Sequence, residues 1–325
     1  MPTTVITGGA GFIGSHLVER FLREGWTVHI IDNLVSGKRE NLAPGATFHE
    51  QDIRDAKSAE LIASVKPDVL AHLAAQMDVR RSVEDPTYDA SVNILGTLNL
   101  LEAVRRHSPK TRVVFASTGG ALYGDNTTPP NFEDTKKDPE SPYAISKLSV
   151  EYYMAYYGRV HGLDTAATRF GNVYGPRQDP HGEAGVVAIF CGRILQGRPL
   201  TIFGDGLQTR DYVYVGDVAE AIWSAATKQL PPIGLLDARG FNVGTGIGTS
   251  VNDLAKILIE EAGTSVPIEY APKRPGEAQD SFVDVSKIER VLGWRPRVTL
   301  REGLANSFRW AAERNAERNA AGSVA

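Results

Sequence analysis

Two side chains near the middle of the chain combine a phenol and an ammonium at a spacing that suits proton transfer. Tyr143 and Lys147 stand four residues apart in the segment SPYAISK, so a helix would place them one turn apart on the same face. A free tyrosine has a pKa of about 10 and is a poor base near neutrality. A lysine one turn away would favour the phenolate and lower that pKa, as would the first turn of a helix. The pair therefore predicts a general base, although in a random helix it would more often be a surface contact.

Hydroxyl side chains are expected beside this pair. Ser117 and Thr118 follow residues 112–116, RVVFA, an apolar run that is typical of a buried strand. A hydroxyl at the carboxyl end of such a strand can hydrogen-bond a substrate oxygen and relay its proton to the tyrosine. Either residue could serve, and the sequence leaves the choice open.

A glycine-rich segment near the amino terminus predicts a dinucleotide site. Gly8, Gly11 and Gly14 lie between the apolar run TTVIT and a helical pattern that begins at residue 12. The early glycines permit a tight turn, the last lets helix and strand pack closely, and the helix N-terminus offers N–H donors to a pyrophosphate. Asp32 ends the next predicted strand, where a carboxylate can accept hydrogen bonds from ribose hydroxyls and would repel a 2′-phosphate. NAD is therefore favoured over NADP.

Residues close to this site refine the prediction. Lys38 and Arg39 could bind a 2′-phosphate, which weakens the preference for NAD. Asp52 and Ile53 follow the third predicted strand and are candidates for the adenine edge, with an acid at a helix N-terminus as the alternative. The small residues in the segment LAAQ, residues 73–76, end the fourth predicted strand and would let a cofactor approach the sheet.

The segments that would position these residues alternate between short β-rich runs and longer helical patterns. Strands are predicted at 3–7, 27–31, 46–50, 68–73, 112–116 and 164–169, and helices at 12–24, 55–65, 86–106 and 141–161. This alternation predicts βαβ units and a parallel sheet that is buried on both faces. We therefore expect an α/β fold with a Rossmann-type doubly wound parallel sheet and a ligand beyond the carboxyl ends of its strands.

The second half of the chain has a looser rhythm. Pro and Gly cluster at 175–185 and again at 272–276, and helical patterns alternate with isolated short strands. We predict an NAD-binding domain over residues 1–170, with later segments near 205–245 returning to it. A smaller, interleaved substrate-binding lobe is expected mainly over residues 171–315, followed by a polar tail over 316–325.

The composition excludes several classes of protein. The 325 residues are 42% hydrophobic and 23% charged, which excludes a collagen-like, disordered or disulfide-stapled chain. A formal charge of -4 gives no basic field for nucleic acid or anionic lipid, so neither is an expected partner. The single cysteine, Cys191, can form no intrachain disulfide, and neither a signal peptide nor a membrane helix is expected. We expect a cytoplasmic protein without a bound metal.

The chain resembles one family along nearly its whole length. The segments that carry the resemblance are TGGAGFIGSHL, DNLVSGKRENL, HLAAQ, SPYAISK, TRFGNVYGPR, TIFGDGLQTRDYVYVGDVA and LGWRP. They are similar to those of the extended short-chain dehydrogenases/reductases, specifically the nucleotide-sugar epimerases and most closely the UDP-glucose (UDP-galactose) 4-epimerases. This resemblance implies an isomerase that oxidises C4 of a UDP-hexose to a 4-keto sugar and reduces it again with tightly bound NAD.

The resemblance also implies roles for individual residues. Those similar to the catalytic residues of the family are Thr118, Tyr143 and Lys147. Those similar to its NAD contacts are Gly8, Gly11, Phe12, Ile13, Gly14, Asp32, Asn33, Ser36, Gly37, Asp52, Ile53, Leu73, Ala74, Ala75, Gln76, Asn93, Ser117, Tyr143, Lys147, Phe170 and Val173. Those similar to its contacts with the nucleotide sugar are Thr118, Asn172, Gly185, Val186, Val187, Ile202, Phe203, Gln208, Arg210, Arg274, Glu277 and Ser281.

The nature of the substrate follows from charge and from missing residues. Planar arginine forks suit a diphosphate, and the resemblance places Arg210 and Arg274 there, although an isolated arginine is more often in a surface ion pair. Sugar 4,6-dehydratases of the family typically carry Asp-Glu directly after the threonine, whereas Thr118 is followed by two glycines. Of the reactions that the resemblance implies, oxidation and re-reduction at a single carbon are therefore the ones expected here. The alternative is an epimerase or reductase of another nucleotide sugar, such as a UDP-uronate or a dTDP-sugar.

Two further expectations come from the resemblance. A small residue near Ser281 goes with N-acetylated sugars, so UDP-N-acetylglucosamine is expected to be accepted alongside UDP-glucose. Helices over 86–106 and 141–161 would pair with those of a second subunit, which implies a homodimer.

Overall fold

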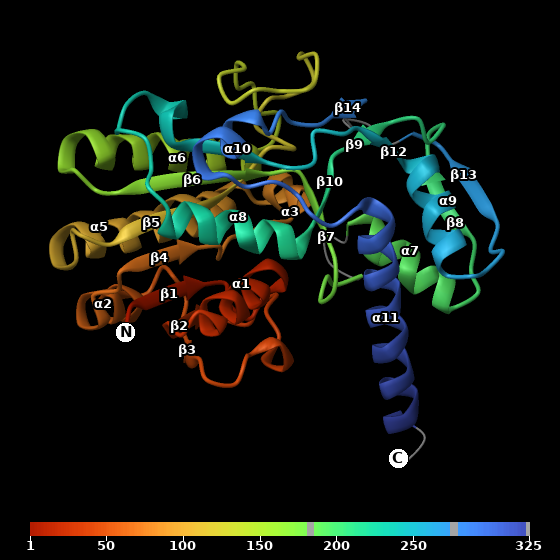
Figure 1. The fold of residues 1–325 in the computed structure, drawn as a ribbon, viewed down its shortest axis with the longest axis horizontal. Helices are drawn as coiled ribbons and strands as arrows, with labels where there is room; N and C mark the ends of the chain where they lie inside the picture. Colours follow the sequence, from red (N-terminus) through yellow and green to blue (C-terminus); the bar gives the residue numbers. More distant parts are fainter. Residues whose placement is uncertain (181–184, 274–278, 323–325) are drawn as a thin grey trace.

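The centre of the protein is a seven-stranded parallel sheet with strand order β11-β6-β5-β4-β1-β2-β3 (Figure 1). The computed structural model describes residues 1–180, 185–273 and 279–322, with side chains to residue 320. The strands of the sheet are β1 (Thr3–Thr7), β2 (Thr27–Asp32), β3 (Thr47–Glu50), β4 (Val69–His72), β5 (Arg112–Thr118), β6 (Thr165–Phe170) and β11 (Gly240–Val243). The order reverses between β1 and β4, which confirms the predicted doubly wound fold.

Helices cover both faces of the sheet. On one face lie α1 (Phe12–Arg23) and α8 (Val215–Thr227), and on the other lie α2 (Ala56–Val65), α5 (Thr97–His107) and α6 (Pro142–His161). Phe21 of α1 packs in one apolar core, and Met154 of α6 packs in the other. Because apolar side chains cover both faces, the central strands carry apolar residues on both sides rather than alternating with polar ones.

The segment predicted as one helix over residues 86–106 is not a single α-helix. It consists of α4 (Pro86–Ala90), a π-helical turn η2 (Ser91–Gly96) and then α5, and it is preceded by α3 (Val79–Glu84). Asp85 caps α4 by accepting a hydrogen bond from the Tyr88 N–H at 2.9 Å. A π-turn shifts the register of the helix face, so it changes which side chains point toward the sheet.

A smaller lobe is built from the second half of the chain and has its own apolar core. Its elements are β7 (Asn172–Tyr174), α7 (Val186–Leu195), β8 (Leu200–Phe203), β9 (Thr209–Arg210), β10 (Tyr212–Tyr214), β12 (Thr249–Ser250), α9 (Val251–Glu261), β13 (Ile268–Ala271), β14 (Asp280–Ser281) and α11 (Leu300–Gly322). Phe190, Leu254 and Leu304 are buried between α7, α9 and α11. The carboxyl half of α11 extends beyond the rest of the molecule (Figure 1).

The remaining elements connect the two parts. The short helices η1 (Arg39–Asn41) and η3 (Leu236–Arg239) lie in loops after β2 and before β11, and α10 (Ser286–Leu292) packs its Ile288 and Leu292 into the core beneath α8. Within the described residues, no helix combines the length and the apolar character that crossing a membrane would require.

Candidate active site

The phenol and the ammonium predicted to transfer a proton lie together at the start of α6. Ser141 caps the helix by accepting a hydrogen bond from the Ala144 N–H at 3.2 Å, and Pro142 occupies its first turn. The Nζ atom of Lys147 lies 5.8 Å from the centroid of the Tyr143 ring. The helix therefore holds both groups on one face, as their spacing predicted.

Lys147 is a buried ammonium beside this phenol. Only 3% of the residue is exposed, and its Nζ donates a hydrogen bond to the Ala116 carbonyl at 2.8 Å. Burial lowers the pKa of Lys147 to about 8, while the negative charges of Asp89 and Glu151 oppose that shift. A positive charge held in a dry site stabilises a phenolate at Tyr143 more strongly than a solvated lysine would.

The two candidate hydroxyls at the end of β5 differ in their surroundings. Ser117 is 3% exposed, and its Oγ donates a hydrogen bond to Glu151. That carboxylate is itself held by Arg169, whose Nη2 lies 2.6 Å from it. Thr118 is the last residue of β5 and is only half-buried. The Ser117 hydroxyl is thus engaged in a buried network, which favours Thr118 as the group that faces a substrate.

The turn between β1 and α1 has the geometry of a dinucleotide cradle. Gly8 has a φ of +73°, and a Cβ at Gly8 would lie 2.8 Å from the Ala74 nitrogen. A Cβ at Gly14 would lie 2.0 Å from the Gly8 carbonyl oxygen, so no other residue fits there. Gly11 precedes α1, where the N–H groups of Phe12 and Ile13 belong to the first turn. This helix end can bind a pyrophosphate.

Asp32 lies at the carboxyl end of β2 beside this turn. Its carboxylate is 7% exposed and accepts hydrogen bonds from the N–H groups of Ala10 at 3.0 Å and Leu34 at 2.8 Å. Burial raises the pKa of Asp32, and these two hydrogen bonds oppose the shift. A Cβ at Gly37 would lie 2.6 Å from Asp32 Oδ1, so the loop that includes Ser36 closes tightly on the carboxylate. The cradle and the acid together fit a dinucleotide.

The basic residues that could have bound a 2′-phosphate have carboxylate partners. Lys38 Nζ lies 2.8 Å from Asp179, and Arg39 forms an ion pair with Glu50. Both ion pairs are exposed and therefore weak, so the buried Asp32 carboxylate is the group that disfavours a 2′-phosphate here.

Asp52 and Ile53, the candidates for the adenine edge, make internal contacts. Asp52 accepts two hydrogen bonds from the Arg54 guanidinium at 2.9 and 2.8 Å, and a third from Asn33 at 3.0 Å. The hydrogen bond from Arg54 lowers the pKa of Asp52 to about 2. The side chain of Ile53 is buried in the core, and its carbonyl accepts a hydrogen bond from Asn99 at 2.8 Å. The acid at the N-terminus of α2 is Asp55, which directly precedes the helix, and Asp52 lies three residues further back.

Residues 73–76 follow β4 at the carboxyl edge of the sheet. The N–H groups of Leu73 and Ala74 each donate to Thr7 Oγ1 at 3.1 Å, and Ala75 is half-buried. Gln76 N–H donates to Asn93 Oδ1 at 2.8 Å, and Asn93 Nδ2 donates back to the Gln76 carbonyl at 2.9 Å. Asn93 is therefore fixed to this segment by its side chain.

The lobe brings several of the predicted substrate residues close to β5. Arg210 and Ser281 are direct partners in the parallel pair of β9 and β14, and Ser281 Oγ donates to the Gly120 carbonyl at 3.4 Å. The Gln208 amide donates to the Phe203 carbonyl at 2.9 Å. The other described candidates are placed as follows: Gly185 precedes α7, Val186 is half-buried, Val187 and Ile202 are buried, Asn172 is exposed, Val173 is half-buried and Phe170 is buried. Arg274 and Glu277 lie outside the described residues.

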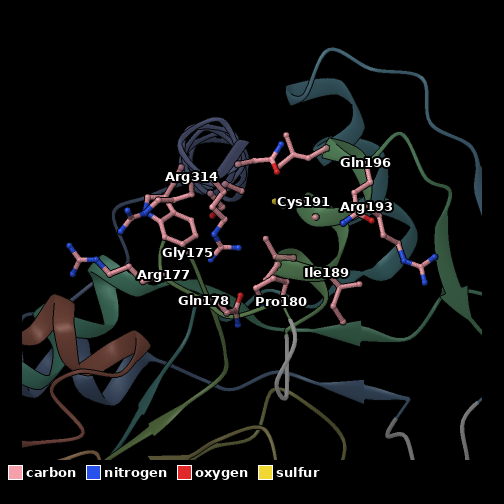
Figure 2. A pocket seen from close by; sticks show the side chains of 18 of the residues that line it. Gly175, Arg177, Gln178, Pro180, Ile189, Cys191, Arg193, Gln196 and Arg314 are labelled. Atoms are coloured by element: carbon pink, nitrogen blue, oxygen red, sulfur yellow. The ribbon is translucent and has the colours of Figure 1, made fainter. Parts of the chain in front are cut away.

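A cavity of about 370 Å³ lies between α7, α11 and residues 175–180 (Figure 2). It is lined by Cys191 and Ile189 of α7, by Arg314 of α11 and by Gln178, among others. Of the predicted site residues that the structure describes, Val187 alone lines it. Neither Tyr143 nor Lys147 lines this cavity.

Some residues that support the site were not predicted from the sequence. Glu151 and Arg169 hold Ser117, and the Ser82 hydroxyl accepts a hydrogen bond from the Tyr143 N–H at 3.2 Å. Arg169 stands in the segment TRFGN, which the family resemblance included, and its position within a buried strand could have indicated a buried ion pair. No sequence pattern pointed to Ser82.

The whole chain can be compared with known proteins. It matches the model of the GDP-mannose 4,6 dehydratase family over residues 5–307. It is 45% identical to the UDP-glucose 4-epimerase of Mycolicibacterium smegmatis over 309 residues. The aligned region covers 94% of this chain and 96% of that protein.

Two solved structures share the fold closely. The structure of UDP-glucose 4-epimerase from Thermotoga maritima with UDP-glucose has a TM-score of 0.91 and 45% identity, covering 96% of this chain and 99% of that one. The structure of UDP-glucose 4-epimerase from Thermus thermophilus in complex with NAD has a TM-score of 0.87 and 44% identity, covering 95% and 98%. The chain therefore belongs to the GDP-mannose 4,6 dehydratase family, a group of NAD-dependent epimerases and dehydratases.

Proposed function

We propose that the protein is a UDP-glucose 4-epimerase that interconverts UDP-glucose and UDP-galactose with a tightly bound NAD. The observation that carries this proposal is the buried Lys147 beside Tyr143, at the carboxyl edge of a sheet whose first turn is built for a dinucleotide. Relatives at 44–45% identity that include structures with UDP-glucose and with NAD support the choice of substrate and cofactor.

The residues that would hold NAD come from the first half of the chain. Gly11 and the first turn of α1 would bind the pyrophosphate, Asp32 the adenosine ribose, and Lys147 the nicotinamide ribose. When bound, NAD accepts a hydride from a sugar carbon and returns it. The Asp52 carboxylate and the backbone carbonyls of Asp52 and Ile53 already accept hydrogen bonds within the protein, so the backbone N–H groups of these two residues would meet the adenine.

The proton chemistry belongs to the side chains at the start of α6. Tyr143, as a phenolate, would take the proton of the sugar 4-hydroxyl, with Thr118 holding the same oxygen by a hydrogen bond. Lys147 stabilises the phenolate while Tyr143 is deprotonated. The same phenol gives the proton back when the 4-keto group is reduced on its other face, so no net acid or base is consumed.

The turn after Thr118 distinguishes an epimerase from a dehydratase, two activities for which relatives in this family are named. A Cβ at Gly119 would lie 3.0 Å from both the Arg169 carbonyl oxygen and the Val283 Cγ1 atom. A Cβ at Gly120 would have its nearest neighbour at 3.7 Å, so the first position is crowded and the second is open. Neither glycine supplies the acidic side chain that an elimination of water would use.

The lobe would bind the nucleotide. We propose that Arg210 binds the diphosphate and that Phe203 and the backbone of residues 185–187 contact the uracil, with Arg274 and Glu277 as further contacts by resemblance. Ser281 is small, and from β14 it contacts Gly120 in the loop after β5, so UDP-N-acetylglucosamine is a second proposed substrate. Assays of both sugars with Ser281→Tyr test this: an unchanged preference contradicts it.

We also propose a homodimer formed through α6 and the neighbouring η2. Tyr152, Tyr153 and Tyr156 expose 55%, 39% and 43% of their surfaces on α6, and Leu95 exposes 61% on η2. Such a cluster of exposed apolar and aromatic side chains is typical of a protein interface. Sedimentation should give a dimer that Tyr153→Asp converts to a monomer, and a wild-type monomer would contradict the proposal.

The division of the chain and its location are proposals as well. Residues 1–170 with the segments near 205–245 would form the NAD-binding domain, because α8 packs on one face of the sheet and β11 is its edge strand. Residues 171–315 would mainly form the substrate lobe. A cytoplasmic location is proposed from the single cysteine, which is buried.

The test of the proposed function is incubation of the purified protein with UDP-galactose, with the products identified by NMR and the cofactor extracted and assayed. Epimerisation at C4 without added NAD supports the proposal. Conversion only of a UDP-uronate or a dTDP-sugar would support the alternative substrates, and a stoichiometric need for NADPH would indicate a reductase.

A further inference from the structure

Within the part of the chain that the structure describes, two buried charges near the reaction centre have no partner of opposite sign in direct contact. Asp89 of α4 is 1% exposed; its Oδ1 accepts hydrogen bonds from the amides of Gln76 and Asn93, each at 3.0 Å. Its Oδ2 has no hydrogen-bond partner among the described residues. Lys147 donates to the neutral carbonyl of Ala116. An isolated buried charge is expensive, so this arrangement calls for an explanation.

The other titratable groups around Lys147 do not compensate its charge. Glu151, one turn further along α6, is bound by the Arg169 guanidinium through three contacts of 2.6 to 3.1 Å. His72 of β4 is 1% exposed, and burial, aided by the charge of Lys147, lowers its pKa to about 3, so it is neutral near pH 7. Tyr143 is the group whose phenolate the Lys147 ammonium stabilises in the proposed reaction, so it is not counted as a permanent counter-charge. The charges of both Asp89 and Glu151 act on Lys147, and of these two carboxylates Asp89 is the one without a cationic partner among the described residues.

A chain of hydrogen bonds also joins Asp89 to the catalytic turn. Asn93 Nδ2 donates to Asp89 Oδ1 and also to Ser146 Oγ, each at 3.0 Å. Ser146 Oγ donates in turn to the Tyr143 carbonyl at 2.8 Å. Asn93 lies on the π-helical turn η2, which places its side-chain amide within hydrogen-bond distance of both Asp89 and Ser146. π-Turns are frequent at functional sites.

We propose that Asp89 is a positioning residue for the reaction at Tyr143. Its carboxylate supplies the counter-charge of the Lys147 ammonium within the buried site, and through Asn93 and Ser146 it fixes the turn of α6 that carries Tyr143. The inference rests on the proposed function, since it assigns a role in that reaction. The opposing effects of burial and of the Asp89 charge on the pKa of Lys147 agree with it.

The test separates charge from position with two variants. Asp89→Asn keeps an oxygen that can accept from Gln76 and Asn93 but removes the charge, so Lys147 loses its proton at lower pH. We expect the alkaline limb of the kcat profile of the NAD-loaded enzyme to move down by about one pH unit. The variant would then be about tenfold slower than wild type near pH 9 and within about twofold near pH 6. Ser146→Ala should lower kcat at every pH without moving the limb.

Direct titration gives a readout that does not depend on turnover. Nitrogen NMR of lysine-labelled protein, with Lys147→Arg for assignment, should show Lys147 titrating at lower pH in Asp89→Asn than in wild type. Glu133→Gln is the matched control, because Glu133 is a buried carboxylate, 5% exposed, that instead accepts from the Asn242 N–H. An alkaline limb and a Lys147 titration that both coincide with wild type would overturn the charge role, and wild-type kcat in Ser146→Ala would overturn the positioning role. A wild-type protein without epimerase activity would instead refute the proposed function.

Discussion

At the scale of single residues, two neighbouring hydroxyls have different environments. Ser117 donates to the buried Glu151, whereas Thr118 ends β5 and is half-buried. Their order in the sequence could not separate them, because both follow the same apolar strand. The distinction depends on Glu151 and Arg169, which come from α6 and β6 and are brought to β5 only by the fold.

The two hydroxyls should therefore respond differently to removal. Thr118→Val should lower kcat by about 10²-fold or more with little change in stability, because it removes a group that binds the reacting oxygen. Ser117→Ala should mainly lower the free energy of unfolding, by about 1–2 kcal/mol, since Glu151 loses a buried donor. Steady-state kinetics and urea unfolding of both variants check this, and equal kinetic losses would contradict the assignment.

Tyr143→Phe tests the base itself. The substitution removes the oxygen that exchanges the proton and leaves the ring, so turnover should fall by about 10²–10⁴-fold while NAD remains bound. Activity and extracted NAD are measured on the same preparation. A variant with near-full activity would rule out Tyr143 as the base.

Asp52 predicts a pH dependence of stability. Its pKa is lowered to about 2 by the hydrogen bond from Arg54, so the contribution is present above the pKa of the unfolded chain, near 4, and is lost as the pH falls through about 2. Because the pair is partly exposed, Asp52→Asn should cost only about 1 kcal/mol at pH 7. Denaturant unfolding at pH 7 and near pH 2, at equal NAD content, should show the difference disappear at the lower pH.

At the scale of elements, the central sheet followed from the sequence, whereas the π-helical turn did not. Strands predicted at 3–7, 27–31 and 164–169 match β1, β2 and β6 to within one residue, because a strand buried on both faces is rich in apolar and β-branched residues on both sides. The helix predicted over 86–106 is interrupted by η2. Its apolar spacing could not reveal this, since the turn is stabilised by contacts of Asn93 with Gln76 and Ser146.

The β1–α1 turn gives a prediction at this scale. Gly14→Ala places a Cβ 2.0 Å from the Gly8 oxygen, which forces α1 away from β1. We expect a loss of about 1–3 kcal/mol in stability and loss of bound NAD. Gly192→Ala in α7 is the control, because the nearest atom to its Cβ would be 4.0 Å away. NAD content and thermal unfolding are measured for both, and NAD retained in Gly14→Ala would show that the turn can adjust.

At the scale of the whole molecule, residues 175–179 cross from the lobe to the dinucleotide-binding helix. Pro176 O and His16 Nε2 are 3.0 Å apart, and Arg177 forms an ion pair with Glu19 of the same helix. Asp179 pairs with Lys38 in the loop after β2. We name residues 175–179 the clasp. Separation of the lobe from the α1 side of the sheet requires these contacts to break.

The clasp should slow the release of NAD. Glu19→Gln combined with Asp179→Asn removes both ion pairs and should increase the dissociation rate of NAD about fivefold, equivalent to ~1 kcal/mol. The fluorescence of released NAD after enzymatic reduction, followed during dialysis, provides the measurement. Glu260→Gln is the control, because it removes an exposed ion pair with Arg301 far from the cofactor. Identical rates in all three proteins would show that the clasp does not retain NAD.

The clasp also bears on how the protein acquires its cofactor during synthesis. Its partners on α1 and the β2 loop emerge from the ribosome more than 130 residues before it does. The contacts of the clasp with α1 and Lys38 can form only after residue 179 has been translated, so before that point they do not hinder a dinucleotide from reaching the turn. The fraction of molecules that carry NAD would then depend on how much NAD the producing cell holds. NAD added to the finished protein should fill the NAD-free molecules only slowly.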